Sequence, residues 1–299
     1  MSILKMKKLF GFLCATVLVC SCTNDYTVFS QSEVVTHSSD LVVQLTELND
    51  SLMATEKIAS RGITYSEAYS YTKIAYKDIK GAYKLGKIGL KIGRFLGPEG
   101  AAAGAVIGGL IGGAGYSYIE YNKCKTRAID SIASPLQVTQ AYVSVLELDT
   151  SYVDHTPTQI TLNFPTINKD AQYMGAKHNL ILQKLLDNDL SLSPINQYLT
   201  QDEIYIISSK EFEESYYVGL ENENNNYEAD EDVSDVVMCL YLEIFQKYPD
   251  KADDVEFITN KYIELVSASN ELTTEEKDII YSALSVAASS YEYWENNLK

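Results

Sequence analysis

The chain has 299 residues, of which 46% are hydrophobic and 22% charged, which is typical of a folded globular protein and argues against wholesale disorder. This length predicts one or two domains. The net charge of −17 argues against general nucleic-acid binding, because such binding needs a cationic surface to displace counterions.

The N-terminus has the pattern of an export signal. Lys5, Lys7 and Lys8 precede an apolar stretch over residues 9–20, which is about 18 Å long as a helix and therefore short for a bilayer span. The sequence Val19-Cys20-Ser21-Cys22 follows. Small or apolar residues before a cysteine resemble the lipobox of bacterial lipoproteins.

This resemblance implies a lipid anchor. In that family the signal peptidase cuts before the cysteine, whose sulfur forms a thioether to diacylglycerol, so Cys22 would become the lipidated first residue. Cys20 fits less well, because Val19 would occupy a cleavage position where a small residue is preferred. A plain secretory signal with a chance cysteine is the alternative. Membrane lipid is the partner that the lipobox implies, because several acyl chains give an effectively permanent anchor.

The charge pattern then divides the chain into four parts. They are a signal peptide (1–21), a tether with a first helix (22–60), a basic region (61–127) and an acidic helical domain (128–299). The basic region holds 11 basic and 4 acidic side chains, whereas the acidic domain holds 9 basic and 31 acidic ones. This asymmetry is the clearest division within the sequence.

The basic region is predicted to open with an amphipathic helix. Before this region, apolar residues at helical spacing predict a helix over 41–59. Within it, Thr64-Tyr65-Ser66-Glu67 fits a capping box that starts a second helix, over 65–95. Cations recur every three or four residues along this second helix, and the spacing predicts that they share one face suited to anionic head groups. They are Lys73, Lys77, Lys80, Lys84, Lys87, Lys91 and Arg94.

Gly97-Pro98 breaks this helix, and glycines recur at every fourth position on each side of the break. A glycine every four residues forms a flat groove that lets another backbone approach closely. The glycines are Gly89, Gly93, Gly97, Gly100, Gly104, Gly108 and Gly112. Because each glycine weakens a helix by about 1 kcal/mol relative to alanine, close packing or a bilayer must compensate.

The segment GAAAGAVIGGLIGGAG resembles the glycine zippers of small bacterial envelope lipoproteins and also the helices of membrane-active bacteriocins. The resemblance transfers no catalytic residue, and the second apolar segment usual in those lipoproteins is replaced here by the cationic helix. Residues 100–119 would span about 30 Å, barely a bilayer. Two interpretations stay open: an antiparallel hairpin buried in a helical domain, or a segment that inserts into or contacts a membrane.

The acidic domain is predicted to be a series of helices. They cover 134–148, 170–186, 200–217, 233–247, 252–268 and 274–297, with capping boxes at Thr200 and Thr273. Residues 150–168 are predicted to be extended or looped. Residues 221–232 form an acidic loop that lacks the glycine and glutamate of a calcium-binding EF-hand.

Catalytic signals are weak. His37, His155 and His178 are isolated in sequence and are predicted to lie on the surface or in loops, and clustered carboxylates are predicted to be solvated helix faces. No metal site and no cofactor is predicted. Cys124 and Cys239 would form a disulfide or remain as two buried thiols.

The sequence therefore predicts a mostly α fold: a glycine-rich helical hairpin plus an acidic multi-helix domain. The functional hypothesis is a non-enzymatic lipoprotein of the cell envelope, periplasmic or surface-exposed, whose hairpin mediates helix packing, self-association or membrane contact. An identical copy or another envelope protein would be the partner. The alternative is a membrane-active secreted effector or bacteriocin-like toxin, and an enzyme that uses helix-borne carboxylates is a third hypothesis.

Overall fold

The computed structural model describes residues 39–56, 65–126, 132–148, 160–166, 171–221, 232–249 and 251–298. The chain divides into two units, Met1–His37 and Ser38–Lys299, and every described residue belongs to the second. The signal peptide, Cys22, His37 and His155 lie outside the described residues.

The described part is mostly α-helical, as predicted, and contains ten α-helices and no strand. The helices are α1 (Asp40–Glu56), α2 (Tyr65–Gly93), α3 (Pro98–Thr126), α4 (Pro135–Leu146), α5 (Gln172–Leu186), α6 (Gln201–Ile207), α7 (Lys210–Glu221), α8 (Val233–Lys247), α9 (Ala252–Ala268) and α10 (Thr274–Asn297). Two short 3₁₀ helices, η2 (Arg94–Leu96) and η5 (Ile195–Gln197), lie between them.

Several helix starts follow directly from capping boxes. Thr200 and Thr273 each accept a hydrogen bond from the backbone N–H three residues ahead, and Glu203 and Glu276 each accept one in return from the cap N–H. Both boxes are confirmed. Ser134 and Gln137 form a third box, which the sequence analysis did not identify. The predicted bounds of α8, α9 and α10 are confirmed residue for residue.

The predicted single helix over 200–217 is wrong. A helical break separates α6 from α7 at Ser208-Ser209. The Ser208 hydroxyl donates to the Ile204 carbonyl at the end of α6, and the Ser209 hydroxyl accepts from the Phe212 N–H at the start of α7. Serine side chains compete for backbone partners in this way, so they favour helix ends over helix interiors.

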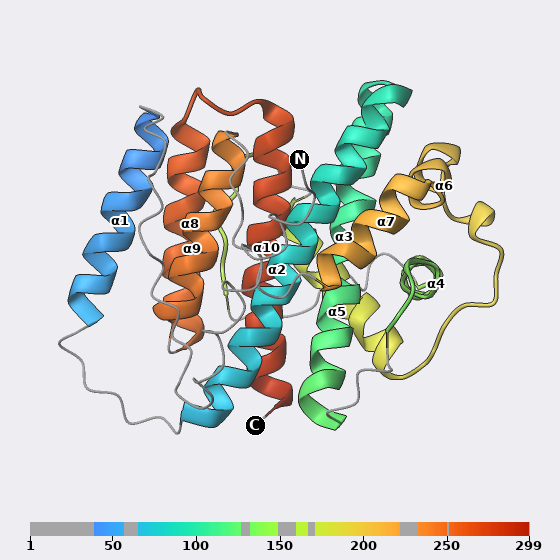
Figure 1. The fold of residues 1–299 in the computed structure, drawn as a ribbon, viewed down its shortest axis with the longest axis horizontal. Coiled ribbons are helices and arrows are strands. Elements are labelled where there is room, and N and C mark those ends of the chain that lie inside the picture. The colour runs from blue at the N-terminus through green and yellow to red at the C-terminus, as the bar shows by residue number, and fades with distance from the viewer. Residues whose placement is uncertain are drawn as a thin grey trace, which may run out of the picture. The chain divides into compact units, whose positions relative to one another are not determined.

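The α2–α3 pair lies at the centre of this unit (Figure 1). The two helices run antiparallel, and α2 also packs against α10, α8, α7 and α6. One hydrophobic cluster joins α2 to α1, α8, α9 and α10, and includes Ile74, Ile79 and Tyr83. A second cluster joins the hairpin to α4, α5, α6 and α7, and includes Leu85 and Ile107. The hairpin therefore separates two cores and supplies side chains to both.

Candidate functional site: the glycine-packed hairpin

Glycines bring the backbones of α2 and α3 into direct contact. A Cβ added at Gly89 would clash with the carbonyl of Gly104, and one at Gly104 would clash with the carbonyl of Gly89. Gly93 and Gly100 oppose each other in the same way, closer to the turn. The glycine faces of the two helices thus cover each other, and no side chain separates them at these levels.

The same contact continues down the pair. A Cβ at Gly108 would meet the carbonyl of Leu85, and Gly112 opposes Gly81. Gly81 was not among the glycines singled out from the sequence, although it lies two turns before Gly89. A glycine in a helix is destabilising by itself, so this repeated pairing shows what compensates for it: close backbone packing.

Gly97 has a different place from the other six predicted glycines. It lies in the turn between the helices with φ +102°, and nothing lies within 4 Å of the position that a Cβ would take. Its role is conformational, because only glycine adopts this backbone geometry without strain. The assignment of Gly97 to the helix-packing stripe is therefore corrected to the turn.

The predicted cationic face is not one open surface. Three of its lysines reach acidic side chains on other helices: Lys73 Nζ lies 2.6 Å from Glu120 Oε1 and Lys91 Nζ lies 2.8 Å from Glu211 Oε1. Lys87 Nζ lies 2.8 Å from Asp232 Oδ2 and 2.6 Å from Asp235 Oδ2.

The remaining four cations differ widely in exposure. Lys80 is 1% exposed, and burial together with the neighbouring charges of Lys84 and Lys77 lowers the pKa of its amine to about 8. Lys77 and Lys84 are half-buried, and Arg94 is exposed beside the hairpin turn. The seven cations therefore do not form one open face, because Lys80 is buried and Lys77, Lys84 and Lys87 are half-buried. A contact of the exposed cations with lipid stays a prediction.

A buried polar cluster joins α2, α3, α5 and α10. Asp78 on α2 is fully buried and accepts hydrogen bonds from the Ser290 hydroxyl and from Trp294 Nε1, the latter at 3.3 Å. Trp294 Nε1 also lies 3.2 Å from Ser117 Oγ. His178 Nε2 lies 3.8 Å from Asp78 Oδ2, beyond hydrogen-bond distance.

Burial keeps both titratable groups of this cluster neutral. It raises the pKa of Asp78 to about 8, against the opposing effect of its hydrogen bonds from Ser290, Ser117 and Trp294. It lowers the pKa of His178 to about 4, although Asn179 and the Gly113 carbonyl favour the charged ring. The expectation that His178 lies on the surface or in a loop is wrong: α5 places it on its buried face.

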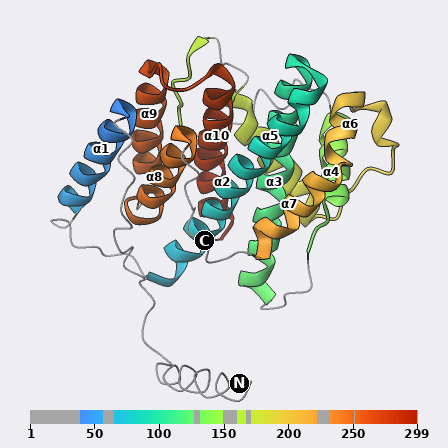
Figure 2. The ribbon, with the colours of Figure 1, turned by 45° about the horizontal axis from the view of Figure 1, so that its top comes forward.

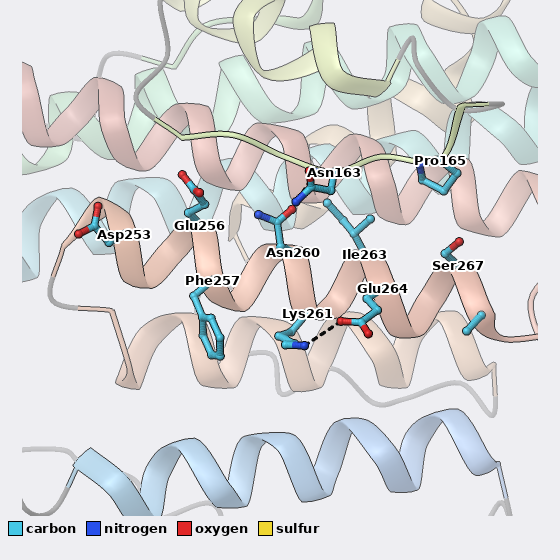
Figure 3. A pocket seen from close by; sticks show the side chains of 11 residues that line it. Asn163, Pro165, Asp253, Glu256, Phe257, Asn260, Lys261, Ile263, Glu264 and Ser267 are labelled. Atoms are coloured by element: carbon cyan, nitrogen blue, oxygen red, sulfur yellow. Dashed lines mark hydrogen bonds and ion pairs between the residues drawn. The ribbon is translucent and has the colours of Figure 1, made fainter.

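An open groove of about 740 Å³ runs along the outer face of α9 (Figure 3). Residues 160–166 form one side of it, held by Asn260, whose Oδ1 accepts from the Asn163 N–H and whose Nδ2 donates to the Thr161 carbonyl. Glu256 accepts from the Thr161 N–H at 2.9 Å. Residues 160–165, which belong to the segment predicted to be extended or looped, are non-helical. Asn260 and Glu256 on α9 hold this segment in place.

The two cysteines described do not pair. Cys124 is exposed and Cys239 is half-buried, where burial raises the pKa of its thiol to about 12. The prediction of a disulfide is therefore wrong, and so is the alternative prediction that both thiols are buried. Within the described ranges, no group of three or more His, Cys, Asp or Glu side chains is arranged to hold a metal ion.

Among the described helices, one segment, Pro98–Lys125 of α3, is long and apolar enough to cross a membrane by length and composition. However, 78% of its most apolar window is buried inside the fold, as in the core helix of many soluble proteins. Comparison of the chain with protein-family models, with curated proteins and with solved structures finds no match.

Proposed function

We propose that this chain is a non-enzymatic lipoprotein of the bacterial cell envelope, held at a membrane by acyl chains on Cys22 and displaying an acidic helical domain. In this proposal the glycine hairpin is the internal frame of that domain. The observation that carries this role is the reciprocal contact of Gly89 with Gly104 and of Gly93 with Gly100. A stripe used for binding another copy or a bilayer would be uncovered, whereas this one is occupied by its own partner helix.

The buried Asp78–His178 cluster supports a structural assignment over a catalytic one. Shifted pKa values are typical of active sites, but they also arise wherever polar groups are fully buried. Both side chains are 0% exposed, so a substrate could not reach them without opening the contacts between α2, α5 and α10. The hydrogen bonds that Asp78 accepts from Ser290 and Trp294 tie the central hairpin to α10.

Lipidation at Cys22 can be tested with a neighbouring cysteine as the matched control. Bacteria expressing the wild-type chain, Cys22→Ser or Cys20→Ser are grown with an alkyne-labelled fatty acid and then fractionated. We expect label and membrane retention for the wild type and Cys20→Ser, and neither for Cys22→Ser. An unlabelled wild-type chain would remove the lipoprotein proposal, and label that persists in Cys22→Ser would remove Cys22 as the lipidated residue.

A further inference from the structure

The turn of the hairpin exposes apolar side chains at one end of the helical unit. Phe95 is 80% exposed and Leu96 is 37% exposed, and both lie in η2 between α2 and α3. Exposed Arg94 precedes them. A bulky aromatic and a leucine beside a long cationic side chain suit the boundary between lipid head groups and acyl chains, where the cation can reach back to water.

The chain enters the described unit at this same end. The Leu41 N–H, in the first turn of α1, donates to Glu271 Oε1 at 3.0 Å, so the start of α1 lies on the connection between α9 and α10. Figures 1 and 2 both place the start of α1, this connection and the α2–α3 turn at one end of the helices. A Cβ added at Gly86 would lie 3.5 Å from Ile279 Cγ2, early in α10, which agrees with this placement because α2 continues from Gly86 toward the turn.

Sequence length limits how far this end can lie from Cys22. Residues 23–38 number 16, and a chain of that length spans at most about 55 Å. An anchor at Cys22 therefore keeps the start of α1 within this distance of the membrane. It raises the local concentration of lipid around the end that carries Phe95, so even a weak contact becomes populated.

The hairpin turn is also held rigidly. Gly93 and Gly100 bring the two backbones together directly below it, and the Ala101 N–H donates to the Gly97 carbonyl at 2.9 Å. A Cβ added at Gly100 would clash with the Cβ of Leu96, so this side chain is packed down onto α3 at its base. A preorganised apolar tip loses little conformational freedom on contact with a surface.

We propose that the turn formed by Arg94, Phe95 and Leu96 docks into the surface of the membrane that holds the Cys22 acyl chains. This inference rests on the proposed lipid anchor. Glu99 follows the turn closely, and Asp202 Oδ2 lies 3.4 Å from where a Cβ of Gly100 would be. These carboxylates disfavour a strongly anionic surface, so the contact is apolar and needs only zwitterionic lipid.

A tryptophan placed in the turn tests the contact. The full-length lipidated chain carrying Phe95→Trp is reconstituted into phosphatidylcholine and phosphatidylethanolamine vesicles with brominated acyl chains, which quench only tryptophans within the bilayer. The matched control is Phe257→Trp, because Phe257 is 46% exposed near the start of α9, away from this end. Native Trp294 is 1% exposed and gives the same background in both variants.

We expect several-fold stronger quenching for Phe95→Trp than for Phe257→Trp. Equal quenching would overturn the inference, as would a Phe95→Trp signal that remains open to aqueous iodide on anchored protein. Protection from iodide without bromolipid quenching would assign the turn to a protein surface and overturn it as well. Fatty-acid labelling of the wild-type chain tests the anchor separately. A chain that carries no lipid overturns this inference together with the proposed function, whereas equal quenching on a lipidated chain overturns this inference alone.

Discussion

Asp78 and His178 are two buried groups whose titration changes the free energy of unfolding in opposite directions as the pH rises. Folding raises the pKa of Asp78 from 3.8 to about 8, so the folded chain holds a proton that the unfolded chain releases. The stability this contributes is fully present below pH 4 and is lost as pH rises toward 8. Folding lowers the pKa of His178 from 6.5 to about 4, so its contribution is gained between pH 4 and 6.5.

These signs predict a pH window in which Asp78 has the largest effect. From pH 6.5 toward 7.5, we expect the free energy of unfolding to fall by up to about 1.4 kcal/mol per pH unit, the linkage slope of one proton. Lys80, whose pKa burial lowers to about 8, opposes this fall only as the pH approaches 8. Asp78→Asn keeps the size of the side chain but carries no titratable proton, so this fall is expected to disappear. Urea unfolding of both proteins at several pH values between 6.5 and 8 measures the difference.

The control for this prediction is the lower pH range. His178 remains in Asp78→Asn, so the variant is expected to gain stability from pH 4 to 6.5, where the opposing effects of the two groups largely cancel in the wild type. A wild-type protein with unchanged stability from pH 6.5 to 8 would show that Asp78 is ionised in the fold and that the cluster is more polar than its burial implies.

This cluster also shows that long-range contacts of single residues cannot be predicted from one sequence. His178 follows Lys177 and precedes Asn179, neighbours that give no sign of burial. Asp78 lies 100 positions away from it and Trp294 lies 216 positions away from Asp78, so only the packing of α2, α5 and α10 brings them together. Long-range proximity of this kind leaves no local signal.

At the scale of the element, the glycines of α3 are not equivalent. A Cβ at Gly104 would clash with the Gly89 carbonyl and lie 3.1 Å from Ile206 Cδ1, and neither backbone can move without separating the helices. Gly109, five residues further along the same helix, would bring its Cβ no closer than 3.4 Å to any atom, an ordinary contact. The two positions therefore separate the effect of packing from the effect of helix propensity.

Alanine at these two positions is expected to change stability in opposite directions. Gly104→Ala should lower the free energy of unfolding by about 2 kcal/mol or more, because overpacking outweighs the better helix propensity. Gly109→Ala should leave it unchanged or raise it by up to about 1 kcal/mol. Chemical denaturation monitored by circular dichroism measures both. Equal effects of the two substitutions would mean that α2 and α3 are not in close backbone contact.

Local signals predicted the elements well and their environment poorly. The capping boxes at Thr200 and Thr273 are formed by side chains within four residues, so the sequence contains everything needed to place those helix starts. The spacing of Lys73 to Arg94 likewise predicts a shared helix face, but not that Glu120, Glu211 and Asp235 come to meet it from other helices. A helix face is local information, whereas its partner is not.

At the scale of the whole molecule, the basic region and the acidic domain form ion pairs with each other inside the described unit. Lysines of the basic region pair with carboxylates that begin or precede helices of the acidic domain, such as Asp232 before α8 and Glu211 in the first turn of α7. Tyr83 adds a 2.7 Å hydrogen bond to Asp235 beside Lys87. The basic hairpin and the acidic helices are therefore one packed body rather than two separate modules.

Because the hairpin is packed into both hydrophobic clusters, the alternative of a membrane-active effector would require these clusters to open. To insert α3 into a bilayer, the hairpin would leave both hydrophobic clusters, exposing Ile107 and Leu110 on one side and Ile79 and Tyr83 on the other. Uncovering several fully buried side chains at about 1.5–3 kcal/mol each exceeds the stability of a typical domain, and the weakly apolar glycine helix regains little of it from lipid.

We therefore expect the purified mature chain to release no dye from phosphatidylglycerol-containing vesicles at micromolar concentration and neutral pH. A peptide of residues 98–125 serves as the positive control, because its glycine face has no partner helix and is free to associate with lipid or with itself. Release by the peptide but not by the folded chain would show that packing against α2 and α10 suppresses membrane activity. Release by the folded chain would instead mean that the hairpin leaves its cores readily, and that the glycine stripe binds its own partner helix more weakly than it binds a bilayer.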